Sequence, residues 1–164
     1  MSDALGHVLR HNAWANKALV EFCAALDPAA LALKAAGTYG TLHGTLQHIV
    51  AGEQFYIRIL TGKLLGAHIR EMEERRALGD LADLAALTGA RAIEIAASDD
   101  GDRPVDVYGH ASTVGVVLAQ MVNHGNEHRG HATTILSTNG RDTPVISGWR
   151  YGIATGISVH DGDN

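Results

Sequence analysis

Three histidines stand close together in the segment Asn123-His124-Gly125-Asn126-Glu127-His128-Arg129-Gly130-His131. At about 100° per residue of helix, His128 lies one turn beyond His124, and His131 returns to within about 20° of His124. All three imidazoles would therefore leave one side of a helix. Two histidines one turn apart can hold a single divalent metal ion, so metal binding is the chemistry that this segment could perform.

A site built from this segment needs a ligand from elsewhere in the chain. Burying two imidazoles beside a leucine-rich core costs about 1–3 kcal/mol each when their nitrogens lack partners, and a metal ion removes that cost. His48, which we expect to face inward from another helix, would complete a set of three neutral imidazoles suited to zinc, nickel or ferrous iron. Three protein ligands leave a position for water or substrate, which is the pattern of a catalytic site.

Other metal-site and catalytic signatures do not match the sequence. A zincin needs Glu directly after the first His, where Gly125 stands, and a di-iron bundle needs paired Glu-x-x-His motifs, which do not occur. Phosphate-binding glycine loops and a G-x-S-x-G elbow are also absent. Glu127 is a residue that supports the metal ligands, a general base, or a surface glutamate. His131 is either a spare ligand or, as we expect, a polar residue of the pocket wall.

The composition favours one soluble domain that spans residues 1–164. The chain is 46% apolar but only 5% aromatic, as in helical proteins with aliphatic cores. With a net charge of −5, the sequence has no excess of basic residues that would bind nucleic acid, and no apolar run is long enough to cross a membrane. The single cysteine, Cys23, and the lack of a signal peptide lead us to expect a cytoplasmic protein.

The hydrophobic periodicity predicts four helices that would position these residues, over 3–26, 41–61, 80–97 and from 112 or 113 to 138. Ser2 and Asp80 are the expected caps of the first and third helices. The charged segment 63–79 reads as a solvated crossover with at most a helical turn, and 105–108 as a short extended segment. In the glycine-rich tail, Trp149 and Tyr151 would dock a short terminal segment.

Each helix carries an apolar stripe that should face the core. The first stripe includes Leu5 and Val8, and the fourth includes Gln120 together with the histidines. Further inward residues are Asn12, Asn16 and Cys23, with the two amides either satisfied in the core or placed beside the metal ligands, and the cysteine a core residue. Trp14 projects from the opposite side, as a partly covered surface residue or as a subunit contact.

Three segments in this order resemble the DinB/YfiT-like four-helix-bundle metalloproteins. His11-Asn12-Ala13-Trp14-Ala15-Asn16 is similar to the family's Y-N-x-W-A-N signature, with His in place of Tyr. Thr45-Leu46-Gln47-His48-Ile49, followed by Glu53, resembles its L-x-H-I segment. Val122-Asn123-His124 and then His128-Arg129-Gly130 resemble its N-H-x-x-x-H-R-G block. His131 stands where glutamine is common, which leaves the polarity of the pocket open.

The resemblance implies an all-α, antiparallel four-helix bundle in up-down-down-up order, with the long crossover between helices 2 and 3. It implies metal-ligand roles for His48, His124 and His128, and a homodimer as in many relatives. Relatives include metal-dependent thiol S-transferases that use bacillithiol, mycothiol or glutathione, a thiol-dependent maleylpyruvate isomerase, and stress- or damage-inducible proteins without an assigned reaction.

We therefore hypothesise a transferase with a mononuclear three-histidine site that activates a low-molecular-weight thiol for attack on an electrophile. The metal would be zinc or nickel in the first place, and iron or manganese otherwise. Glu127 is the candidate catalytic residue. The alternatives are a metal-binding stress protein without turnover, in which His131 could close the site, and a thiol-dependent isomerase. We expect no nucleic-acid or membrane partner.

Overall fold

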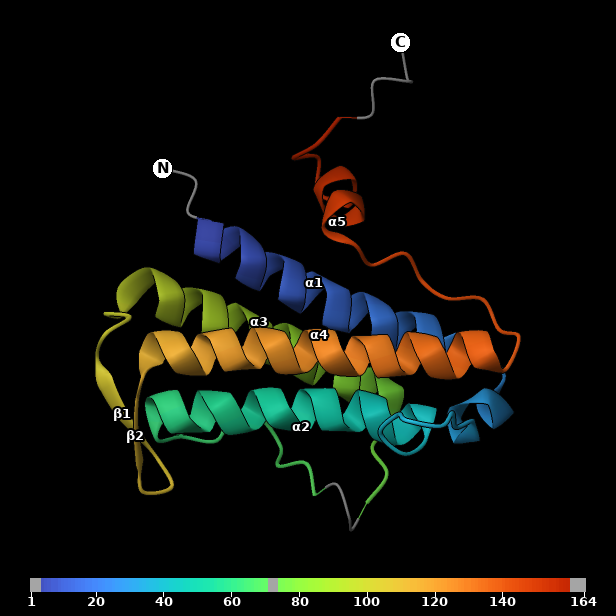
Figure 1. The fold of residues 1–164 in the computed structure, drawn as a ribbon, viewed down its shortest axis with the longest axis horizontal. Coiled ribbons are helices and arrows are strands. Elements are labelled where there is room, and N and C mark those ends of the chain that lie inside the picture. Colours follow the sequence, from blue (N-terminus) through green and yellow to red (C-terminus); the bar gives the residue numbers. More distant parts are fainter. Residues whose placement is uncertain (1–3, 71–73, 160–164) are drawn as a thin grey trace.

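The computed structural model describes residues 4–70 and 74–159. Most of this part of the chain is helical, in the long helices α1 (Ala4–Ala24), α2 (Leu42–Thr61), α3 (Leu78–Ser98) and α4 (Val114–Thr138). Figure 1 shows these helices lying side by side. The smaller elements are η1 (Pro28–Ala32), β1 (Pro104–Val107), β2 (His110–Thr113) and α5 (Gly148–Ala154). The expected helical class is confirmed, whereas η1, β2 and α5 had no clear signal in the sequence.

Local chemistry sets most of the helix ends. The Thr41 hydroxyl caps α2 by accepting from the Gly44 N–H, and Gly62 ends that helix at a φ of 70°, where glycine carries no steric penalty. Thr113 caps α4 in the same way as Thr41 caps α2. The prediction that Asp80 caps α3 was wrong. That helix begins at Leu78, so Asp80 lies in its first turn, where its negative charge interacts favourably with the helix dipole. Ser2 lies outside the described residues.

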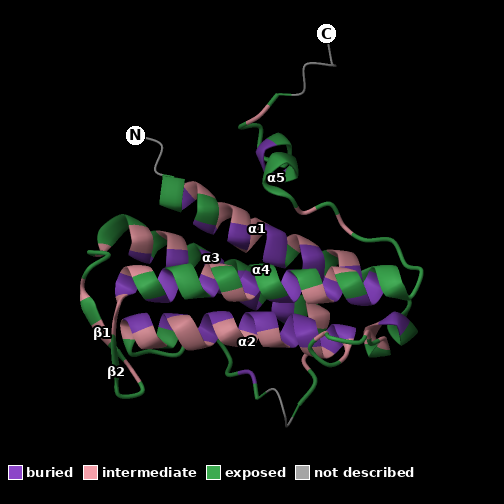
Figure 2. Ribbon diagram, viewed as in Figure 1, coloured by how far each residue is buried: buried purple, intermediate pink, exposed green. Residues whose placement is uncertain are grey.

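The buried apolar residues lie on the helix faces that meet one another (Figure 2). The predicted inward stripe of α3 is confirmed, because Leu81, Leu84, Thr88, Ala92 and Ile95 are all buried. Pairs of helices share this core. The principal contacts join α1 to α3, α2 to α4 and α2 to α3.

Three residues predicted to face the core are instead exposed. Leu5 and Val8 remain 41% and 45% accessible, and Val8 lines a hollow between α1 and the tail, whereas Gly6 and Leu9 on the neighbouring face of α1 are buried. Gln120 is exposed at the edge of the contact between α4 and α2, where its amide donates to the Tyr56 hydroxyl at 3.4 Å.

The crossover between α2 and α3 is held by buried polar side chains of α2. The Gln54 amide nitrogen donates to the carbonyls of Leu65 (2.7 Å) and Ala67 (2.9 Å), and its oxygen accepts from the Ile69 N–H at 3.1 Å. Gln47 makes an equivalent clamp further along, donating to the Glu74 carbonyl and accepting from the Arg76 N–H. The expected crossover carries no helical turn over its described residues 63–70 and 74–77, and residues 71–73 lie outside the described part of the chain.

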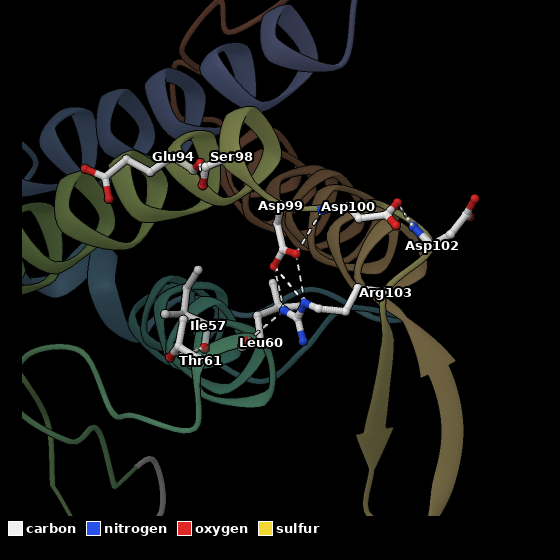
Figure 3. Close-up of polar contacts among 9 residues, drawn as sticks. All are labelled: Ile57, Leu60, Thr61, Glu94, Ser98, Asp99, Asp100, Asp102 and Arg103. Carbon is white, nitrogen blue, oxygen red and sulfur yellow. Dashed lines mark hydrogen bonds and ion pairs between the residues drawn. The ribbon is translucent and has the colours of Figure 1, made fainter.

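A two-stranded hairpin closes one end of the helices. The expected extended segment is confirmed over 105–107 within β1, which pairs antiparallel with β2, whereas its last residue, Tyr108, lies in the turn. Tyr108 and Gly109 form the two-residue turn, both at positive φ (52° and 85°). The Arg103 guanidinium binds both carboxylate oxygens of Asp99 and donates to the Leu60 carbonyl at 3.2 Å, as Figure 3 shows for the turn that leads into the hairpin. These bonds fix the hairpin to the end of α2.

The tail docks on α1 through one of the two aromatic residues predicted for that role. Tyr151 on α5 is only 7% exposed, and its ring lies 5.8 Å from those of both His11 and Trp14. Trp149 is 83% exposed, so its predicted docking role was wrong. The short helix directs only one face toward α1, and Trp149 lies off that face. Within the described residues, no helix is long and apolar enough to span a membrane.

Candidate metal centre

His48 on α2 and His124 and His128 on α4 converge at the contact between these two helices. Each offers a ring nitrogen, and these nitrogens lie within 4.8 Å of one another. The ring centroids are 4.5 to 4.8 Å apart for all three pairs, so the rings surround a common point. His128 is buried, and His48 and His124 are half-buried. The three side chains are therefore close enough to bind a metal ion.

The spacing of the nitrogens suits one shared ion. The Nε2 atoms of His48 and His124 are 3.1 Å apart. Two imidazole nitrogens bound to one tetrahedral zinc at about 2.0–2.1 Å lie about 3.3 Å from each other. Two ligand atoms are thus already near the separation that a metal requires, and neutral imidazoles are suitable donors for zinc, nickel or iron.

His131 contacts the trio from outside. Its Nδ1 lies 3.1 Å from the Nδ1 of His128, so His128 is held through this nitrogen and its Nε2 faces away from that contact. Metal-binding histidines are commonly oriented by such a hydrogen bond on the second ring nitrogen. The structure therefore places His131 beside the candidate ligand His128, and its role as a polar residue of the pocket wall stays a prediction.

Gly52 provides the space that the His124 ring occupies. A Cβ atom at position 52 would lie 2.5 Å from Cε1 of His124 and 2.9 Å from its Nδ1, closer than van der Waals contact allows. The sequence contained a signal for this contact that our prediction missed. Glycine inside a helix costs about 1 kcal/mol relative to alanine, so its presence there indicates a close approach.

Two tyrosines flank the histidines. Tyr39 stacks on His48, with ring centroids 3.9 Å apart and planes at 17°. It also makes a T-shaped contact with His128, with ring centroids 5.3 Å apart. Tyr56 makes an edge contact with His124 at 5.7 Å. Tyr39 lies in the loop before α2, and its carbonyl accepts a hydrogen bond from the Thr45 hydroxyl. These rings restrict the orientations of the imidazoles, and sequence patterns alone did not point to either of them.

Asn12 and Asn16 belong to a buried polar network. Both amide nitrogens donate to Oε1 of Glu53, at 3.0 and 2.7 Å, and both amide oxygens accept from the Arg129 guanidinium. The Thr88 hydroxyl donates to the other Glu53 oxygen at 2.5 Å. The interpretation of these asparagines as satisfied core amides is therefore confirmed. The buried Arg129 was missed, although it immediately follows a predicted ligand.

Burial dominates the electrostatics of this network. Burial raises the pKa of Glu53 to about 7, although the hydrogen bonds and the charge of Arg129 act in the opposite direction. Burial also lowers the pKa of Arg129 to about 10. Arg129 and Gly125 face α1, where a Cβ at position 125 would lie 2.7 Å from Oδ1 of Asn12. The network thus holds α4 against α1 on the face next to the one that carries His124 and His128.

Two further candidate residues differ in their surroundings. Glu127 is exposed on α4, one residue before His128, and its role as a general base stays a prediction. Cys23 is fully buried, and burial raises the pKa of its thiol to about 12. A thiol in that state is not a nucleophile at neutral pH, so the interpretation of Cys23 as a core residue is confirmed.

Comparisons with known proteins agree on one family. The model of the DinB family matches residues 1–157. Protein DinB of Bacillus subtilis (strain 168) is 23% identical over 152 residues, which cover 85% of this chain and 88% of that protein. The crystal structure of a DinB-like protein from Bacillus cereus ATCC 10987 superposes with a TM-score of 0.66 at 19% identity, covering 84% of this chain and 91% of the other. That structural similarity shows a shared fold.

Proposed function

The chain belongs to the DinB family, and on that premise we propose that it holds one divalent metal ion with His48, His124 and His128 and activates a low-molecular-weight thiol for transfer to an electrophile. The observation that carries the proposal is the convergence of three imidazoles from two helices. Zinc or nickel is the expected metal, with iron or manganese as the other choices. When bound, such a cation would stabilise the thiolate, which is the nucleophilic form of a thiol.

The protein side chains around the trio support an open site rather than a closed one. Among the described residues, no fourth His, Cys, Asp or Glu joins the group, and His48 and His124 are half-buried. A purely structural zinc site has four protein ligands, whereas a catalytic one has three. His131 would orient His128, and the exposed Glu127 is our candidate to accept the thiol proton. A metal-binding protein without turnover and a thiol-dependent isomerase are the alternatives.

We also propose the finer features that the family suggests. The pairing of α1 with α3 and of α2 with α4, with a long crossover between α2 and α3, supports an antiparallel bundle in up-down-down-up order. A homodimer and a cytoplasmic location are proposals as well. Trp14 was one candidate for the dimer contact. Its ring packs against Tyr151 on α5 of the same chain, so only the part that stays accessible could contact a second subunit.

The metal proposal is tested by elemental analysis of untagged protein, purified and then reconstituted with zinc or nickel. The wild type should hold one ion per chain, and His124→Ala should lower the affinity by roughly 100-fold or more because a ligand is lost. His68→Ala is the matched control, since His68 is an exposed histidine of the crossover. Equal metal content in His124→Ala and wild type would overturn the proposal.

The catalytic proposal needs a separate assay. Bacillithiol, mycothiol and glutathione are each incubated with a generic electrophile and either the metal-loaded wild type or His124→Ala. One thiol should be consumed faster with the wild type, and the variant should fall to the uncatalysed rate. Equal rates for both proteins would leave a metal-binding protein without this activity.

A further inference from the structure

A second feature of the contact between α2 and α4 is a hollow of about 260 Å³ beside the hairpin. We name it the hairpin hollow. The helices contribute Tyr56, Ile59, Val117 and Gln120 to its walls, and the hairpin contributes Val107 and Ala111. The hollow thus lies between α2 and a distant, continuous segment of the chain that includes the hairpin and the start of α4.

The hairpin hollow lies along the same line of contact as the histidines. Around α2, Ile59 is within about 20° of His48, and around α4, Val117 is within about 20° of His124. Tyr56 connects the two places, because its ring lines the hollow and also lies 5.7 Å from the His124 ring. Tyr56 therefore contacts both the hollow and one of the candidate metal ligands.

The lining selects an uncharged, apolar occupant. Valine, isoleucine, alanine and aromatic carbon form most of the walls, and the described residues that line the hollow include no Lys, Arg, Asp or Glu, although an exposed histidine, His110, is among them. A charged group placed against the apolar walls would lose water without gaining a Lys, Arg, Asp or Glu partner. An apolar cavity of about 150 Å³ is large enough to hold benzene. The hairpin hollow can therefore accept one substituted aromatic ring, whereas a folded protein segment would not fit.

The outer wall is fixed in place before any ligand arrives. Arg103 holds Asp99 at the end of α3 and the Leu60 carbonyl at the end of α2 (Figure 3). The hairpin therefore cannot move from α2 without breaking these bonds. A larger hollow of about 430 Å³ lies between α1 and α5, but its lining includes neither the three histidines nor the tyrosines that flank them.

We propose that the hairpin hollow binds the uncharged aromatic part of the small-molecule electrophile, next to the three-histidine centre. The inference rests on the proposed function for the identity of the ligand as a substrate. The binding itself depends only on the walls of the hollow, so it can be measured in the absence of metal.

The test is a methyl-detected NMR titration of the full-length protein in the presence of a chelator, with benzyl alcohol and benzoate as probes. The two probes share a ring and differ in charge. Benzyl alcohol should shift the methyl signals of Ile59, Val107 and Val117 in a saturable way, and benzoate should bind at least about tenfold more weakly. Equal binding of the two probes, or no saturable shift at these methyls, would overturn the proposal.

A substitution locates the binding. Ala111→Trp places an indole at an exposed position of the hairpin that lines the hollow, and Ala119→Trp adds the same side chain at an exposed position of α4 outside the lining. Ala111→Trp should weaken benzyl alcohol binding by at least about tenfold, whereas Ala119→Trp should bind like the wild type. Wild-type binding by Ala111→Trp would contradict the proposal.

The failure of the metal proposal would look different. If the metal proposal fails, the wild-type protein holds no metal, but benzyl alcohol still shifts the methyl signals of the hollow. Failure of the present inference would appear as missing shifts in a protein that still binds metal at its histidines.

Discussion

At the scale of single residues, the candidate centre depends on the missing side chain of a glycine as well as on the three histidines. Three imidazoles meet between α2 and α4 because Gly52 lacks the side chain that would displace one of them. The stacking of Tyr39 on His48 and the contact of His131 with His128 then limit how two of the rings can turn. Affinity for a metal ion should follow from these neighbours as well as from the ligands.

Gly52→Ala tests this dependence. The new methyl group would push the His124 ring from its place, so we expect metal affinity to fall by at least about tenfold while the helix itself remains intact. The measurement is calorimetric titration with zinc. Gly79→Ala is the control, because a Cβ at position 79 meets nothing within 4 Å, and it should leave the affinity unchanged. If both variants bind zinc equally well, the close approach has no role in metal binding.

At the scale of elements, α2 carries two kinds of polar residue with different tasks. His48 faces α4, whereas the buried side chains of Gln47 and Gln54 bind the backbone of the crossover. Buried backbone groups need partners when they leave regular structure, and these amides supply them. The crossover is thus attached to the helix that presents one of the candidate ligands.

Gln54→Ala should loosen that attachment. It would leave the carbonyls of Leu65 and Ala67 and the N–H of Ile69 without their present partner, for a loss of about 2–3 kcal/mol in the free energy of unfolding. Hydrogen exchange at the Ile69 amide should accelerate. Lys63→Ala, at an exposed position of the same crossover, should change neither quantity. An unchanged exchange rate at Ile69 in Gln54→Ala would show that the clamp does not hold the segment.

At the scale of the whole molecule, one buried polar network joins all four long helices. Asn12 and Asn16 come from α1, Glu53 from α2, Thr88 from α3 and Arg129 from α4. Such networks stabilise a structure only when every member is satisfied, so they select one arrangement of the helices over others of similar hydrophobic burial.

The network also predicts how stability depends on pH. The pKa of Glu53 is raised by burial from 4.5 to about 7, so the folded state binds a proton that the unfolded state releases between these values. The contribution of Glu53 to stability is therefore complete below about pH 4.5 and is lost as the pH rises through about 7. The expected loss is roughly 3 kcal/mol.

Glu53→Gln isolates this contribution. The variant keeps an uncharged side chain at every pH, as the protonated Glu53 of the wild type does near pH 5, so its fall in stability between pH 5 and pH 8 should be shallower than that of the wild type. The free energy of unfolding of both proteins is measured by urea denaturation in the presence of a chelator, at several pH values between 5 and 8. Parallel stability curves for the two proteins would exclude Glu53 as the titrating group.

The sequence by itself determined the four long helices and the three histidines. Helical periodicity and hydroxyl caps act within a few residues, so they can be read without knowing the neighbours. The spacing of His124 and His128 on one helix face is likewise a local property. The same local reasoning misplaced Leu5, Val8 and Gln120, because an apolar stripe is buried only where another element covers it.

The tertiary structure decided everything that depends on contacts between helices. Only the packing of α2 against α4 brought His48 to the other two histidines and set Gly52 beneath one of their rings. Only the packing of α1 against α4 gave Arg129 its buried partners. Such contacts join residues far apart in the sequence, and their energies arise from close packing and satisfied polar groups, which a local pattern does not encode.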